Sequence, residues 1–204
     1  MPPTIAVDID ETLAWTVGHW VKQMQILFGN PEQLSVQEMV DKYRYTQNIP
    51  YWQSKEILAW AEEQKQSNRD QLDIPLIENS NTVLQEIHNI IPIKAYISIR
   101  PQRVFLGTKK WLEKYHFPQA DIILRPDEIP HTEGNQWKAS LLAKIFPSIN
   151  IVMDDNPKRM EYFPSSYQGT ILFFNATTSP RTDINIIPCK TWKDIQKTIL
   201  SIKV

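Results

Sequence analysis

The sequence has a single cysteine, Cys189, among its 204 residues. One cysteine cannot form an intramolecular disulfide, so a disulfide-stabilised fold is excluded and a reducing compartment is expected. No apolar run is long enough to cross a bilayer, and no charged and apolar leader precedes the first strand. We therefore expect a cytoplasmic protein without a membrane partner, in which Cys189 is a buried packing residue.

An excess of charge of either sign is also missing. The sequence has 22 Lys and Arg against 23 Asp and Glu, a formal net charge of −1. A protein that binds a long nucleic acid needs a basic field, so this balance disfavours that class, although locally clustered bases could still hold a nucleic-acid end. Repeats and low-complexity tracts are absent, and the length suits one core with an insertion.

Short apolar runs alternate with segments that have helical spacing of apolar residues. The runs are residues 4–9, 93–98, 121–124, 149–153 and 170–174, and the helical segments include residues 83–89, 104–115, 137–146 and 192–202. Strands that alternate with helices imply right-handed crossovers and a parallel sheet. We expect an α/β, Rossmann-like fold with about five strands and helices on both faces of the sheet.

The exception is the connection between the first two predicted strands. About eighty residues separate Leu13 from Ile93, far more than a crossover helix needs. They contain helix-like segments, and Ser35 with Glu38 forms a capping-box pattern. We predict a small helical cap at residues 14–77, inserted into a core of residues 1–13 and 78–204.

The cap is rich in aromatic residues, of which Trp15 is nearest to the end of the first strand and Tyr45 lies in a Tyr-Arg-Tyr cluster. Aromatic faces can stack on a nucleobase, so these two residues are candidate substrate contacts. The alternative is that they form the core of the cap, as most aromatics in a small helical unit do.

Two acids and a hydroxyl follow the first predicted strand, as Asp8, Asp10 and Thr12. In an α/β sheet this strand end opens into the ligand crevice. One carboxylate there can coordinate a hard cation and attack an electrophile, and a second can transfer a proton. A helix cap or turn explains one such residue but not two acids in register.

The Asp-x-Asp-x-Thr pattern resembles the signature of the haloacid dehalogenase (HAD) superfamily of phosphohydrolases. Residues of the types that the family's site requires follow in chain order, at or after later strands: Ser98, Lys138, Asp154 and Asp155. The sequences Tyr-Ile-Ser-Ile-Arg-Pro, which includes Arg100, and Met-Asp-Asp-Asn are similar to the 5′(3′)-deoxyribonucleotidase branch.

This resemblance implies a phosphatase that acts on a small phosphate ester, a nucleoside monophosphate in that branch. It implies that Asp8 is the nucleophile that forms an aspartyl-phosphate and that Asp10 is the general acid and base. Thr12, Ser98 and Lys138 would serve the phosphoryl group. Arg100 is either a further phosphate contact or a salt-bridged loop residue.

The resemblance also implies Mg²⁺ as the cofactor. Its ligands would be the Asp8 carboxylate, the Asp10 main-chain carbonyl and a carboxylate of the Asp154–Asp155 pair, with Asp155 preferred as the direct ligand. Such acids repel one another when no cation compensates them. We therefore expect that Asp8→Asn leaves the fold intact and raises the melting temperature of the metal-free protein.

Two alternatives remain open. Arg100, Arg103 and the Arg125-Pro126-Asp127 segment are similar to parts of the 3′-phosphatase domain of polynucleotide kinases, which would make the protein an end-processing enzyme for nucleic acids. The other alternative is a non-catalytic binding protein on the same fold. The presence of both Asp8 and Asp10 argues against it.

Overall fold

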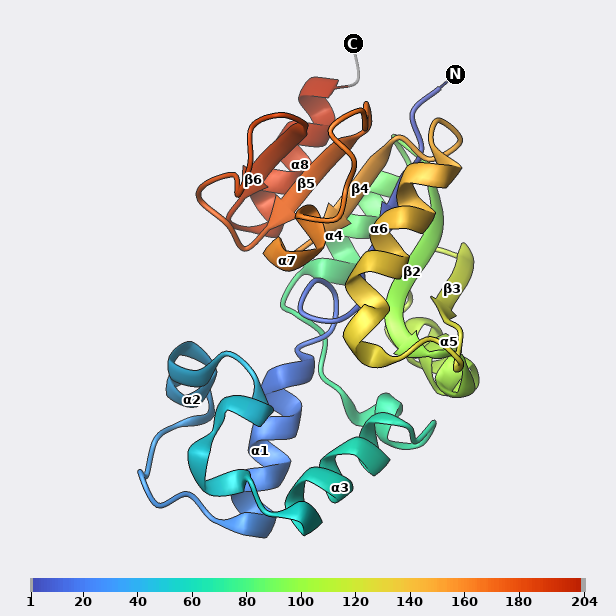
Figure 1. Ribbon diagram of the computed structural model, residues 1–204. Helices are drawn as coiled ribbons and strands as arrows, with labels where there is room; N and C mark the ends of the chain where they lie inside the picture. The colour runs from blue at the N-terminus through green and yellow to red at the C-terminus, as the bar shows by residue number, and fades with distance from the viewer. Residues whose placement is uncertain (1, 203–204) are drawn as a thin grey trace.

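The computed structural model describes residues 2–202, which form two lobes (Figure 1). Within that range the larger lobe is built on a six-stranded parallel sheet in the order β3-β2-β1-β4-β5-β6. Its strands are β1 (Ile5–Val7), β2 (Ile93–Pro101), β3 (Asp121–Arg125), β4 (Ile151–Asp154), β5 (Thr170–Phe174) and β6 (Asn185–Cys189). The predicted α/β, Rossmann-like architecture is confirmed.

The first strand lies in the interior of the sheet, between β2 and β4. All three residues of β1 are buried, as a parallel strand covered on both faces requires. The sheet has six strands where about five were expected, because β6 also pairs with β5. The sequence analysis did not predict β6, because Pro188 lies within it and proline has no backbone N–H to donate to a neighbouring strand. An edge strand tolerates the loss of this hydrogen bond.

Helices cover both faces of the sheet, and each face has its own apolar cluster. The first cluster includes side chains of α4 (Ser80–His88), α5 (Phe105–Lys114) and α8 (Trp192–Ile202). The second includes side chains of α6 (Gly134–Ile145) and the short α7 (Pro157–Met160), which lie on the near face of the sheet in Figure 1. Cys189 is buried in the first cluster, as predicted.

The smaller lobe contains α1 (Thr16–Phe28), α2 (Val36–Tyr43) and α3 (Lys55–Lys65), with two short 3₁₀ turns between α2 and α3. It has a hydrophobic cluster of its own: Val21, Met24, Met39, Ile49, Trp52 and Ala61. The capping box of Ser35 and Glu38 forms at the start of α2. The predicted boundaries at residues 14 and 77 remain a prediction.

A segment after α3 ties the helical lobe to the core. The Asn68 side chain donates a hydrogen bond to the Arg103 carbonyl (2.8 Å) and accepts one from the Gly107 amide (2.6 Å). An added Cβ at Gly107 would lie 2.3 Å from the Asn68 carbonyl oxygen, so only glycine permits this approach. Among residues 2–202, no helix is both long and apolar enough to cross a membrane.

Candidate active site

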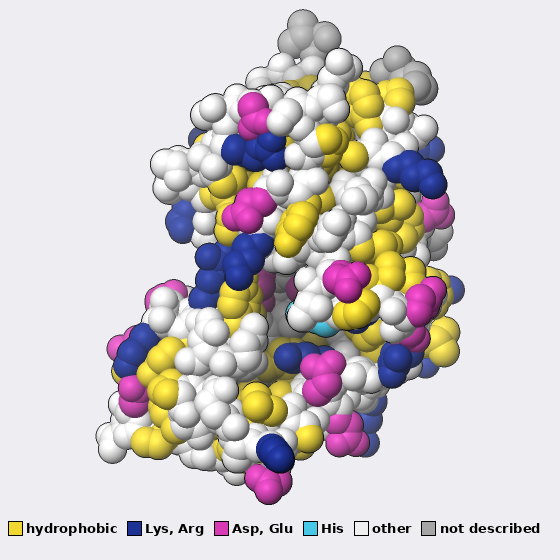
Figure 2. Space-filling view, viewed as in Figure 1, with side chains coloured by type: hydrophobic (Ala, Val, Ile, Leu, Met, Phe, Trp, Pro, Cys, Tyr) yellow, Lys and Arg dark blue, Asp and Glu magenta, His cyan; other side chains and the backbone are white. Residues whose placement is uncertain are grey.

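A cleft with a cavity of about 440 Å³ lies between the two lobes, at the carboxyl edge of the sheet. Figure 2 shows it as a hollow with acidic, basic and histidine side chains on its walls. The core contributes Asp8 and Asp10 from the loop after β1, and Arg100 and Arg125 from β2 and β3. The helical lobe contributes a wall that includes Tyr45.

The loop after β1 is a tight turn that places both acids in the cleft. The Asp8 amide donates to the Met153 carbonyl (2.9 Å), which extends the sheet pairing by one residue. The amides of Leu13 and Ala14 then both donate to the Ile9 carbonyl, at 2.8 and 2.9 Å. Glu11 takes a left-handed φ of 58°, an uncommon conformation for a residue with a side chain.

Asp8 lies against two buried cations that it shares with Asp154. The Lys138 Nζ is 2.7 Å from an Asp8 oxygen and 2.9 Å from an Asp154 oxygen. The Arg159 guanidinium is 2.9 Å from the other Asp8 oxygen and also pairs with Asp154. Burial alone would raise the pKa of Asp8, but the charges of Lys138 and Arg159 outweigh it and hold that pKa below its ordinary value.

Arg159 was missed by the sequence analysis. It follows the paired acids by one turn of α7, whose first residue is Pro157 and whose N-cap is Asn156. A helix that starts directly after the acids turns the side chain at this position back toward them. The Pro-x-Arg spacing after Asp154 and Asp155 was therefore the available signal.

Asp155 differs from Asp8 and Asp154 because no Lys or Arg of residues 2–202 forms an ion pair with it. Burial raises its pKa well above the ordinary value, and the negative charges of Asp8 and Asp154 raise it further. Oxygen atoms of these three acids lie within 4.8 Å of one another. Such a cluster of hard oxygen donors fits a divalent cation such as Mg²⁺.

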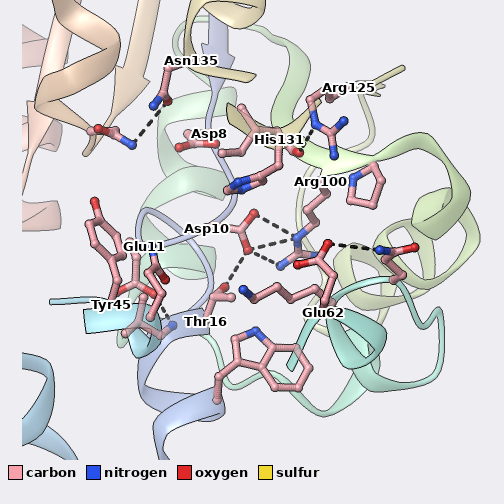
Figure 3. A pocket seen from close by; sticks show the side chains of 18 of the residues that line it. Asp8, Asp10, Glu11, Thr16, Tyr45, Glu62, Arg100, Arg125, His131 and Asn135 are labelled. Carbon is pink, nitrogen blue, oxygen red and sulfur yellow. Dashed lines mark hydrogen bonds and ion pairs between the residues drawn. The ribbon is translucent and has the colours of Figure 1, made fainter. Parts of the chain in front are cut away.

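Three side chains from two other elements, β2 and α1, donate hydrogen bonds to Asp10, and Figure 3 shows two of them, Arg100 and Thr16. Arg100 approaches it with Nη2 at 2.8 Å and Nε at 3.0 Å, and the Ser98 and Thr16 hydroxyls donate at 3.0 and 2.6 Å. Burial would raise the pKa of Asp10, but the charge and hydrogen bonds of Arg100 lower it overall. Arg100 is therefore salt-bridged, although it lies on β2 and not in a loop, and it also lines the cleft. Its contact with phosphate remains a prediction.

Glu11 is a second residue that the sequence analysis did not single out. It lines the cleft beside Asp10, and its side chain accepts a hydrogen bond from the Val17 amide at 2.6 Å. Burial raises the pKa of Glu11 to about 7.

The other predicted residues lie at different depths. Ser98, Lys138 and Thr12 are fully buried beneath the cleft; the first two reach the site through Asp10 and Asp8. The structure does not bring Trp15 to the cleft among the residues it describes: its ring packs so closely on α1 that a Cβ at Gly18 would be 2.1 Å away. Tyr45 does line the cleft, together with Trp20.

No protein-family model and no curated protein matches the sequence. Solved structures do match its fold. A HAD-family hydrolase from Deinococcus radiodurans R1, determined with bound phosphate and sodium, has a TM-score of 0.58 and 12% identity over 98% of this chain and 96% of its own. A HAD-superfamily hydrolase of subfamily IA from Geobacter sulfurreducens PCA has a TM-score of 0.60 and 8% identity over 97% and 96%.

A third structure, a HAD-superfamily hydrolase from Ehrlichia chaffeensis, has a TM-score of 0.52 and 17% identity over 98% of this chain and 97% of its own. The chain therefore has the fold of the HAD-superfamily hydrolases along nearly its whole length, in keeping with the resemblance seen in the motifs. At these identities the likeness concerns the fold alone.

The ion pairs reverse the expected effect of Asp8→Asn on stability. Because Lys138 and Arg159 would then share the single charge of Asp154, we expect the metal-free variant to lose on the order of 3 kcal/mol. Urea unfolding in the presence of a chelator measures this. A more stable Asp8→Asn protein would show that the two cations do not compensate Asp8.

Asp155→Asn should instead stabilise the metal-free protein, because Asp155 is the acid that has no cation. Since its folded-state pKa is raised, the folded protein binds its proton more tightly than the unfolded chain and loses stability as pH rises. The advantage of Asp155→Asn over the wild type should therefore be absent below about pH 4 and grow above it. Unfolding curves across this pH range in chelator test the sign.

Proposed function

We propose that the protein is a Mg²⁺-dependent phosphomonoester hydrolase that acts through an aspartyl-phosphate. The observation that carries this proposal is the convergence of Asp8, Asp10 and the Asp154–Asp155 pair at one sheet edge, with buried Lys138 against the first acid. Its support from other proteins is the shared fold with HAD hydrolases, one of which was determined with bound phosphate.

Asp8 is the proposed nucleophile, because its lowered pKa keeps the carboxylate ionised. One of its oxygens forms a bond to phosphorus while the bond from phosphorus to the ester oxygen breaks. Asp10 gives its proton to the departing oxygen. Water then attacks phosphorus, returns a proton to Asp10 and releases phosphate from Asp8. Lys138 offsets charge on Asp8 throughout.

The ion pair between Arg100 and Asp10 has to weaken before Asp10 can act as an acid in this reaction. In the free protein it keeps Asp10 ionised, and an ionised carboxylate cannot act as an acid. An incoming phosphate offers the guanidinium a competing anion. In our proposal Arg100 moves partly to the phosphoryl group, which raises the proton affinity of Asp10 when substrate arrives.

Mg²⁺ would be held by the carboxylates of Asp8 and Asp155 and by the main-chain carbonyl of Asp10. When bound it supplies positive charge to the phosphoryl oxygens and relieves the repulsion on Asp155. Of the two adjacent acids, Asp155 is the more available ligand, because Lys138 and Arg159 pair with Asp154 and no cation pairs with Asp155 in the described residues.

The proposed substrate is a nucleoside monophosphate, because Tyr45 and Trp20 give the helical lobe aromatic faces along the cleft. The 3′-phosphatase alternative would suit a basic groove. The cleft is instead balanced, since its lining includes six Asp or Glu and six Lys or Arg residues. The complete set of acids argues against a purely non-catalytic role.

Asp8→Asn should abolish turnover of every phosphomonoester, because an amide cannot attack phosphorus in its place. Phosphate release from a panel of mononucleotides, sugar phosphates and an aryl phosphate measures this. Asp121→Asn, an exposed acid at the start of β3, is the matched control and should keep wild-type rates. Substantial turnover by pure, folded Asp8→Asn protein would exclude the covalent mechanism.

Removal of divalent cations by a chelator should silence the wild type, and added Mg²⁺ should restore it. Asp155→Ala should raise the Mg²⁺ concentration needed for half-maximal activity on the order of tenfold or more, and Asp154→Ala should raise it less. Melting curves with and without Mg²⁺ follow binding separately from turnover. Equal activity in chelator and in Mg²⁺ would rule out the metal site.

If Tyr45 stacks on the base, Tyr45→Ala should lower kcat/KM for nucleotides by roughly ten- to a hundredfold and hardly affect a small aryl phosphate. Trp15→Ala is the comparison, because the Trp15 ring packs on α1. We expect it to lower stability and both activities together. A parallel loss in Tyr45→Ala would mean that Tyr45 also only packs.

A further inference from the structure

Arg125, at the end of β3, is a buried arginine that lines the cleft (Figure 3). Its residue is only 6% exposed, yet no carboxylate of residues 2–202 forms an ion pair with it. Its neighbours in the cleft do have acid partners: Arg100 pairs with Asp10, and Arg103 pairs with Asp127. Arg125 is therefore a buried cation with no carboxylate in ion-pair contact within the described residues.

Main-chain carbonyls accept hydrogen bonds from two of the three guanidinium nitrogens of Arg125. Nε donates to the Ile99 carbonyl at 3.1 Å, and Nη1 donates to the carbonyls of Ile129 and Pro126. Nη2 has no acceptor in the part of the chain that the structure describes. Carbonyl dipoles meet hydrogen-bonding needs but do not cancel a full charge, so a buried arginine held in this way retains its attraction for an anion.

The titration behaviour of two buried arginines agrees with this difference. Burial lowers the pKa of Arg125, and the charges of Asp127 and Glu62 only partly offset it. Burial also acts on Arg159, but there the charges of Asp154 and Asp8 raise the pKa overall. The comparison separates an arginine that has its counter-ions from one that lacks them.

The stem of Arg125 is held in place before any ligand binds. A Cβ added to Gly134 would lie 3.4 Å from the Arg125 Cδ and 3.2 Å from the Ile99 side chain, so the chain passes close to both. A guanidinium fixed by packing and by carbonyl hydrogen bonds loses little freedom when it binds an anion. This is the arrangement of a binding group more than that of a mobile surface arginine.

A second unpaired cation faces the same cleft from the helical lobe. Lys65, the last residue of α3, is half-buried and forms no ion pair with any residue from 2 to 202. Lys65, Arg125 and His131 all line the cleft, and the charges of the two cations add to burial in lowering the pKa of the His131 imidazole. The exposed Glu62 forms no ion pair among residues 2–202, and its charge acts on both Arg125 and His131.

We propose that Arg125, with Lys65 across the cleft, binds a second anionic group of the substrate, separate from the phosphoryl group attacked by Asp8. The inference rests on the proposed phosphomonoester hydrolysis and revises the proposed substrate, from a nucleoside monophosphate to a phosphomonoester that carries a further phosphate or carboxylate. A nucleoside bisphosphate has this chemistry, whereas a nucleoside monophosphate has only the reacting phosphate.

The test compares three esters with the same carbon chain: propyl phosphate, 3-phosphonooxypropanoate and propane-1,3-diyl bisphosphate, with longer homologues to find the best spacing. A charged hydrogen bond predicts that the wild type prefers the bisphosphate or the carboxylate over propyl phosphate by about tenfold or more in kcat/KM. Which of the two is preferred identifies the second anion.

Arg125→Gln should remove this preference, mainly through KM, and leave propyl phosphate within about twofold of wild type, because only the second anion loses its partner. Arg125→Lys, which keeps the positive charge, should retain part of the preference for the ester with a second anion. Arg103→Gln is the matched control: its guanidinium already has Asp127, so the preference should persist. Melting temperatures of all variants are measured beside the kinetics.

Equal losses on propyl phosphate and on the bisphosphate in Arg125→Gln would show a structural arginine and overturn the proposal. If the wild type hydrolyses neither these three esters nor any of the mononucleotides, sugar phosphates and aryl phosphate, the proposed function fails, and calorimetry with Mg²⁺ then tests the site alone. Tighter binding of the bisphosphate than of propyl phosphate, cancelled by Arg125→Gln, would support the anion site. Equal binding of both would refute it.

Discussion

The buried ion-pair cluster of Asp8, Asp154, Lys138 and Arg159 is the interaction on which the rest of the site depends. Asp8 and Asp154 lie at the ends of adjacent strands, and without a positive charge between them their carboxylates would repel each other. Two cations from α6 and α7 supply it, at contacts of 2.7 to 2.9 Å for Asp8. Both helices are thereby anchored to the strands whose acids they neutralise, and Asp155 is left as the acid free to bind a cation.

The fold and most of the acids were predictable, because they follow from local pattern. Apolar runs marked all strands except β6, where Pro188 interrupted the run, and the motif order placed Asp8 and Lys138 in one site before any contact was known. Which charged side chains form ion pairs with one another was not predictable. The spacing of Pro157 and Arg159 after the paired acids indicated Arg159, but nothing around Arg125 distinguishes a buried arginine from a solvated one, since that depends on how β3 packs in the folded protein.

The helical lobe shows the same limit. Its existence followed from the long connection after the first strand, but the identity of the cleft-lining aromatics did not. Trp15 is closer in sequence to Asp10, yet the start of α1 turns its ring onto Gly18, and Trp20 one turn later takes a place in the cleft. Proximity along the chain is a poor guide where a helix begins, because successive side chains diverge by about 100°.

The pairing of β1 with β4 sets an order on how the site can form. Asp8 and Arg159, which lie in hydrogen-bond contact, are 151 positions apart in the chain. During synthesis Asp8 emerges early, and its two cations follow only after β2 and β3 have been made. A partly synthesised chain therefore cannot form even a partial version of this site. Contacts between residues so far apart in sequence form late and slowly. The protein acquires its charged cluster only when the last third of the chain has folded onto β1.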